Sequence, residues 1–159
     1  MTYEEAAATV KPGLYRHFKG NCYRVLSIAR HSETSEPMVV YKALYGDGGL
    51  WVRPADMWNE TVERDGKTFR RFHPLSREER VAFYEKIYDE LKAVPAEAGL
   101  KIGAEEIRLK LALLDEYYTS GEWLEDYEAD EAGLLPKDMK RGVLSQDGLY
   151  DLLEEWRDL

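Results

Sequence analysis

The sequence has little of what marks an exported or membrane protein. It contains one cysteine, Cys22, so no disulfide can form within the chain. No apolar run approaches the roughly 20 residues that a membrane-spanning helix requires. The first residues, MTYEEAAATVKPG, are acidic where a signal peptide would be basic, and they lack a long apolar centre. These absences predict a cytoplasmic protein with no membrane contact.

The sequence also lacks the common catalytic motifs. No nucleophile elbow, phosphate-binding loop or HExxH zinc motif is present. An enzyme would have to use His17 or His31 as a base, with Glu33 as the carboxylate that orients it. Candidate nucleophiles for such an enzyme are Ser32, Thr34 and Cys22. Because five adjacent polar residues do not define a catalytic triad, we favour a binding role, assign no catalytic residue and expect no cofactor.

One acidic segment was tested as a metal site. Asp126, Glu128 and Asp130 have the spacing with which a calcium-binding EF-hand loop begins. The pattern then fails, because Glu131 stands where the loop needs glycine and Lys137 where it needs a bidentate glutamate. We therefore predict a charged helix end with no metal, and expect the basic run 137–141 to pair with nearby acidic side chains.

What is present divides the chain into two halves. Apolar residues make up 44% of the sequence and charged residues 33%, which is typical of a packed, soluble protein. Residues 1–75 hold 11 Lys and Arg against 9 Asp and Glu, whereas residues 76–159 hold 11 against 22. The net charge of −9 therefore comes from the second half, and we expect two modules of opposite sign.

The first half has the pattern of a small β-domain, which we place at residues 12–74. Short apolar runs separated by turn residues predict strands at 14–18, 23–29, 39–45, 50–53, 61–64 and 67–72. Asp65-Gly66 predicts a type I′ hairpin. The third strand is apolar on both faces, which suits a closed barrel or a covered strand. We expect an SH3-like barrel, with Met57 or Trp58 tucked beneath the sheet and residues 1–11 as a helical turn or a frayed tail.

The second half, residues 76–159, has the pattern of a small helical domain. Ser76 and Glu79 form a capping box, and apolar residues at helical spacing follow up to Pro95. Further helices are predicted around 107–118 and 123–130, the first of them stopped by Gly121. Ser145 should cap the last helix, whose apolar stripe is Leu149, Leu152, Leu153 and Trp156. The fold class is therefore α+β, with the barrel first and the helices second.

At these residues the chain resembles two families of unknown function. GLYRHFKGNCYRVL, ARHSET, VVYKALYGDGGLWVRP and the closing E-V-DGK-F pattern resemble the DUF1653 family over residues 12–73. YYTSGEWLEDYEADEAGLLPKDMKRGVLSQDGLYDLL resembles the DUF4298 family over residues 80–159. The first resemblance implies an SH3-type β-barrel and the second a small helical domain. Neither supplies a catalytic motif, so both leave the function open.

The basic half also carries the candidate ligand-binding residues. Arginine side chains grip phosphate or carboxylate groups, and exposed rings stack on bases, prolines or cations. The candidates are Arg16, His17, Arg30, His31, Glu33, Tyr45, Trp51 and Arg53. Taken singly, each is more simply explained as a core aromatic or a solvated arginine. Taken together, they favour a face that binds nucleic acid or another small anionic or aromatic ligand.

A protein adaptor that docks through its acidic helical domain is the alternative function. Salt separates the two hypotheses, because contacts to phosphate weaken steeply with added salt and apolar docking does not. The sequence does not determine whether the chain forms a homo-oligomer.

Overall fold

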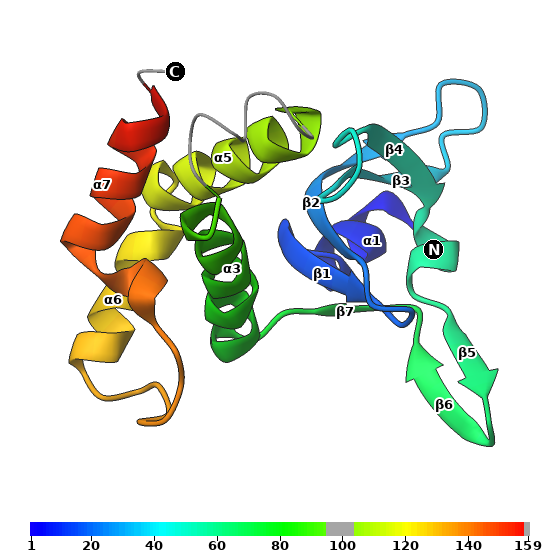
Figure 1. Cartoon of the computed structure of the whole chain (residues 1–159). Coiled ribbons are helices and arrows are strands. Elements are labelled where there is room, and N and C mark those ends of the chain that lie inside the picture. The colour runs from blue at the N-terminus through cyan, green and yellow to red at the C-terminus, as the bar shows by residue number, and fades with distance from the viewer. Residues whose placement is uncertain (95–103, 158–159) are drawn as a thin grey trace. The chain divides into compact units, whose positions relative to one another are not determined.

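The computed structural model describes residues 1–94 and 104–157 of the chain. These residues form two compact units, Met1–Leu75 and Ser76–Leu159, which we describe separately (Figure 1). The fold is α+β, with an antiparallel sheet in the first unit and helices in the second. None of the helices in the described part of the chain has the length and apolar character that a bilayer crossing requires.

The N-terminal unit is built on a five-stranded antiparallel sheet. Its elements are α1 (Tyr3–Thr9), β1 (Gly13–His17), β2 (Cys22–Arg30), β3 (Pro37–Ala43), β4 (Leu50–Pro54), α2 (Ala55–Trp58), β5 (Thr61–Arg64), β6 (Lys67–Arg70) and β7 (Phe72–Pro74). The strand order is β4-β3-β2-β1-β7, and β5 and β6 form a separate two-stranded hairpin. Within the described residues, no backbone pairing joins the edge strands β4 and β7, so closure of the sheet into a barrel is not observed.

The predicted last strand is interrupted at Arg71. The Arg71 N–H donates to the Glu60 carbonyl and the Arg71 carbonyl accepts from the Phe18 N–H, both at 2.9 Å. The hairpin β5–β6 therefore leaves the sheet at this residue, and only β7 returns to pair with β1. At the hairpin tip, Asp65 (φ 53°) and Gly66 (φ 74°) both have positive φ, as the predicted type I′ turn requires.

The core of this unit lies on one side of the sheet, beneath the two short helices. α1 packs on β2 and α2 on β3 and β4. The buried cluster contains Ala6, Val10, Tyr15, Val25, Val39, Tyr41, Ala55, Trp58 and Phe72. Along β3 every second residue is buried and the others are half-buried, so the expectation of a strand covered on both faces holds only in part. Trp58 is the buried residue of the 54–58 turn, whereas Met57 is 42% exposed.

The N-terminal segment is a capped helix and not a frayed tail. Thr2 accepts a hydrogen bond from the Glu5 N–H, and the Glu5 carboxylate accepts one from the Thr2 N–H, both at 3.1 Å. This capping box begins α1, whose Ala6 and the following Val10 are buried in the core. Of the two alternatives, the helical one is confirmed.

The second unit consists of helices. They are α3 (Arg77–Lys92), α5 (Ala104–Thr119), α6 (Glu122–Glu131), the 3₁₀ helix η1 (Gly142–Leu144) and α7 (Gln146–Arg157). The predicted capping box is present, with Ser76 and Glu79 exchanging hydrogen bonds of 3.1 and 3.2 Å. Gly121, with φ 97°, follows α5, and the Ser145 hydroxyl accepts from the Gly148 N–H at the start of α7. Pro95, the predicted end of the first helix, lies outside the described residues.

Two carboxylates of the acidic segment 126–131 have partners within the protein itself. Asp126 is fully buried and accepts hydrogen bonds from the Arg80 guanidinium, with Nε at 2.9 Å, and from the Tyr117 hydroxyl at 2.6 Å. Asp130 pairs with Arg141, which confirms in part the expected pairing of the basic run. Across the described ranges, no three His, Cys, Asp or Glu side chains gather as a metal site would require.

Candidate ligand-binding site

The strand register decides which of the predicted binding residues share a face. Residues directly opposite each other in an antiparallel pair project to the same side of the sheet. Trp51 in β4 lies opposite the core residue Tyr41, and Arg53 follows two residues later on the same side. In β1, His17 lies opposite Phe72. His17, Trp51 and Arg53 therefore all project to the side of the aromatic core.

Three polar side chains contact the buried ring of Phe72, and a fourth, Tyr45, contacts one of these three; we call this group the Phe72 cluster. The His17 and Tyr23 rings meet the Phe72 ring edge-on, with centroids at 4.9 and 5.7 Å. The Arg53 guanidinium carbon lies 5.6 Å from the same ring centroid. The Tyr23 and Tyr45 hydroxyls share a hydrogen bond of 2.6 Å. The cluster thus combines three predicted residues with Tyr23, which sequence reasoning treated only as part of a strand.

The Arg53 guanidinium is incompletely satisfied. Its Nε is buried and has no hydrogen-bond partner in the described part of the chain. A buried N–H without an acceptor costs about 1–3 kcal/mol, so such atoms are uncommon in folded proteins. The Phe72 ring faces the guanidinium with its π electrons, which stabilise the charge and leave the N–H without an acceptor.

His17 lies in a positive environment. Burial lowers the pKa of its imidazole below the ordinary value, and the nearby charges of Arg71, Lys19 and Arg53 lower it further. Its Nδ1 accepts a hydrogen bond of 3.2 Å from the Lys19 backbone N–H. The neutral ring must therefore carry its proton on Nε2, which is a donor. Since the charges that lower its pKa are those of cations, His17 is suited to contacting an anion.

Tyr23 also keeps its proton at neutral pH. Burial raises the pKa of Tyr23, and the hydrogen bond and charge of Tyr45 raise it further. Two hydroxyls that share one hydrogen bond use one of their two hydrogens in it, so the other remains for a ligand. Guanidinium, imidazole and phenol donors that gather in one cluster are suited to holding an oxyanion.

A different group of predicted residues lies near the other end of β2. The Arg30 guanidinium stacks on the Tyr3 ring of α1 at 4.0 Å. The Nδ1 of His31 accepts from the backbone N–H groups of Glu33 and Thr34, at 3.1 and 3.4 Å. Glu33 therefore meets His31 through its backbone and not through its carboxylate. These contacts organise a turn and do not form the base and carboxylate pair considered for an enzyme.

The last two predicted residues lie apart from both groups. Arg16 alternates with Tyr15 and His17 along β1, so it projects from the opposite face of the sheet, where it is half-buried. Trp51 is 58% exposed on the edge strand β4. It projects to the same side of the sheet as the Phe72 cluster, and its ring stacks on no other ring within the described part of the chain.

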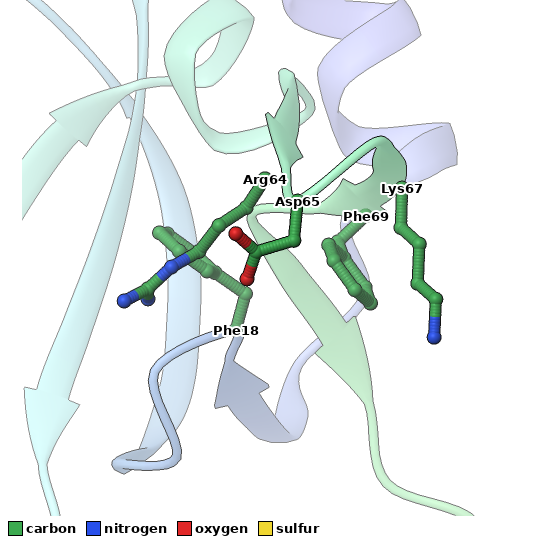
Figure 2. Close-up of a pocket in the computed structure, with 5 residues that line it drawn as sticks. All are labelled: Phe18, Arg64, Asp65, Lys67 and Phe69. Carbon is green, nitrogen blue, oxygen red and sulfur yellow. The ribbon is translucent and has the colours of Figure 1, made fainter.

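A pocket lies next to the cluster, on the side of Phe18. It has a volume of about 250 Å³ and is lined by Phe18, Arg64, Asp65, Lys67 and Phe69 (Figure 2). The Phe18 and His17 rings lie 4.5 Å apart, so the pocket and the Phe72 cluster are neighbours. None of the lining residues was among the predicted candidates. The signal was available, because alternation along the hairpin places Arg64, Lys67 and Phe69 on one face.

Comparison with known proteins places both halves of the chain. The model of the family described as "Protein of unknown function (DUF1653)" matches residues 13–74. The model described as "Domain of unknown function (DUF4298)" matches residues 82–159. A crystal structure of a DUF1653 protein from Bordetella bronchiseptica is 39% identical, covering 43% of this chain and 91% of that one, with a TM-score of 0.41. The search of curated proteins returned no match.

These matches define a two-domain α+β protein whose domains are both of unknown function. The chain belongs to the DUF1653 family through its N-terminal unit, and a DUF4298 domain follows. The resemblance to both families, in this order, is confirmed.

Proposed function

We propose that the N-terminal unit is an SH3-like β-barrel that binds an anionic ligand, a nucleic acid or a small molecule, at the Phe72 cluster. The single observation that carries the proposal is the buried Arg53 Nε, which has no acceptor in the described residues. An oxygen of a bound phosphate or carboxylate would accept from it and remove the cost of leaving it unsatisfied. One hydroxyl of the Tyr23–Tyr45 pair, the one whose hydrogen is not used within the pair, and the His17 Nε2 would donate to the same anion.

The contact between Arg53 and Phe72 also supports the barrel. Arg53 belongs to β4 and Phe72 to β7, the two edge strands of the sheet. Side chains from opposite edges meet only if the sheet curls strongly, as sheets do in small barrels. The anion would then bind where the two edges approach each other.

The test compares two arginines in the intact chain. Arg53→Met keeps the apolar stem and removes the guanidinium, and Arg30→Met is the matched control on the Tyr3 ring. Inorganic phosphate and uridine monophosphate are titrated while the amide resonances are followed by NMR. Arg53→Met should weaken binding roughly tenfold or more, as expected for loss of a charged hydrogen bond, and Arg30→Met should change it little. Equal losses in both variants, or no binding by the native chain, would refute the proposal.

Two accessory expectations from the sequence remain proposals. The location proposed is the cytoplasm, because the one cysteine, Cys22, is a buried free thiol and a disulfide framework is absent from the sequence. The adaptor role of the acidic helical unit is the alternative function. If the native chain binds neither phosphate nor nucleotide, this alternative becomes the first to test.

A further inference from the structure

The pocket beside the Phe72 cluster has its own chemistry. Two phenyl rings line it, from Phe18 after β1 and from Phe69 on β6, with the Asp65 carboxylate between them in the view of Figure 2. The Phe69 side chain is 41% exposed, so its ring is accessible to a ligand. The pocket has a volume of about 250 Å³, which is below the roughly 300–1,000 Å³ of pockets for drug-sized ligands. The pocket therefore suits a single ring system.

Two cations flank these rings. Arg64 and Lys67 lie opposite each other in the hairpin, and Phe69 follows Lys67 on the same face. Figure 2 shows the Arg64 guanidinium and the Lys67 ammonium extending away from each other, one on either side of Asp65. Within residues 1–94 and 104–157, neither cationic group has a hydrogen bond or an ion pair with another residue. Exposed rings between unpaired cations are typical of surfaces that bind single-stranded nucleic acid.

We propose that this pocket holds one unpaired base of a single-stranded nucleic acid, with Arg64 and Lys67 contacting the phosphates on either side of that base. The base would stack on the phenyl rings, and the two cations would bind the phosphate groups of the nucleic-acid backbone. The inference goes beyond the anion site proposed above, because it names a polymeric ligand and uses neither Arg53 nor His17. The two proposals can therefore fail separately.

Asp65 gives this pocket a base preference. Its carboxylate repels phosphate and accepts hydrogen bonds, and it has no other partner among the described residues. A carboxylate accepts best from two adjacent N–H donors, which guanine presents on its Watson–Crick edge. Uracil presents one N–H between two carbonyl oxygens, which the carboxylate repels. We therefore expect the pocket to favour guanine over uracil.

The experiment uses the full chain and fluorescein-labelled RNA octamers, one of uridines only and one with a single central guanosine. Fluorescence anisotropy gives the dissociation constants at several salt concentrations. The native chain should bind the guanosine octamer more tightly. Phe69→Ala should weaken binding roughly tenfold, as expected for the loss of one stacking ring.

Two matched charge variants test whether the RNA phosphates lie on the face of the hairpin that carries Lys67. Lys67→Ala and Arg70→Ala each remove one cation from β6, but Arg70 lies on the opposite face of the hairpin. Lys67→Ala should weaken binding and reduce the salt slope by about 0.7, and Arg70→Ala should do neither. Equal effects in the two variants would mean unspecific attraction and would overturn the proposal.

Asp65→Asn tests the base preference. Asparagine tolerates the positive φ of this position, so the turn should survive. The variant should bind the uridine octamer more tightly and lose most of its preference for guanosine. If the native chain binds both octamers equally, the guanine assignment is wrong. Failure to bind either octamer, or loss of binding in Arg53→Met but not in Phe69→Ala, would overturn the pocket itself.

Discussion

The two units differ in whether their buried polar groups are hydrogen-bonded. In the helical unit, the buried carboxylates of Asp126 and Glu85 are held by donors from other elements of that unit. In the N-terminal unit, the buried nitrogen atoms Arg53 Nε, Trp58 Nε1 and Arg71 Nε have no acceptor among the described residues. Buried polar groups are thus hydrogen-bonded within the helical unit, whereas three buried N–H donors of the N-terminal unit have no acceptor among the described residues.

This difference separates the roles that we propose for the two units, stability for the helical network and binding for the Phe72 cluster. A satisfied buried network fixes one arrangement of helices, and removing one member leaves the others uncompensated. An unsatisfied buried donor costs free energy in the isolated protein, and a ligand can recover that cost. We therefore expect substitutions in the helical network to act on folding, and substitutions at the Phe72 cluster to act on binding.

The largest expected effect is at Asp126. Burial lowers the pKa of Arg80, but its hydrogen bond to Asp126 and their attraction outweigh burial, so the net pKa is raised. Asp126→Ala would leave the guanidinium and the Tyr117 hydroxyl without their acceptor. The free energy of unfolding of the helical unit should fall by about 3–5 kcal/mol. Urea titration of the full chain, followed by circular dichroism, measures it.

The control for Asp126 lies on the same helix. Glu128 is exposed, and Glu128→Ala should change the free energy of unfolding by less than about 0.5 kcal/mol. If Asp126→Ala costs no more than this control, the buried network does not stabilise the helical unit, and the contrast between the two units disappears.

A smaller effect is expected at Glu85. Its carboxylate accepts from the backbone N–H groups of Gly142 and Val143, at 3.1 and 2.8 Å, at the start of η1. Glu85→Gln keeps one acceptor and turns an amide N–H toward the other donor, so the helical unit should lose about 1–3 kcal/mol. The same urea titration measures it, with the exposed Glu78→Gln as control. An unchanged midpoint in Glu85→Gln would show that water replaces the carboxylate.

Local signals in the sequence predicted the local structure well. The Ser76 and Glu79 capping box and the Asp65-Gly66 turn each depend on residues within one turn, and both formed as expected. Thr2 and Glu5 carry the same capping signal, but whether α1 formed depended on docking against the core, which no local pattern reports. The break at Arg71 was missed for the same reason, because its partners Glu60 and Phe18 are distant in sequence.

The sequence could predict which candidate residues lie together only as far as it could predict how the strands pair. His17 and Arg53 were chosen for their chemistry, and the register then placed both on the core side. Arg30 and His31 were chosen in the same way, but β2 has nine residues and a length of roughly 25 Å, which separates them from Tyr23. Phe69 was missed because an apolar residue in a strand is more often core than surface.

The smallest expected effect is a dependence of the stability of the N-terminal unit on pH, caused by His17. The pKa of His17 lies below its ordinary 6.5, first because of burial and then because of Arg71, Lys19 and Arg53. The unfolded chain therefore binds a proton more readily than the folded one between the lowered pKa and 6.5. The stability of the N-terminal unit should be complete above about pH 6.5 and should decrease as the pH falls through this window.

His17→Asn should remove that decrease, because asparagine does not titrate and its side-chain oxygen can still accept from the Lys19 N–H. Urea midpoints measured between pH 7.5 and 5 provide the comparison, with His31→Asn as the control at the far end of β2. A bound phosphate should reverse the sign, since its charge favours the imidazolium and raises the pKa of His17, so that affinity increases as the pH falls. If NMR titration finds the same His17 pKa with and without phosphate, the imidazole does not face the anion, and Arg53 and one hydroxyl of the tyrosine pair must hold it alone.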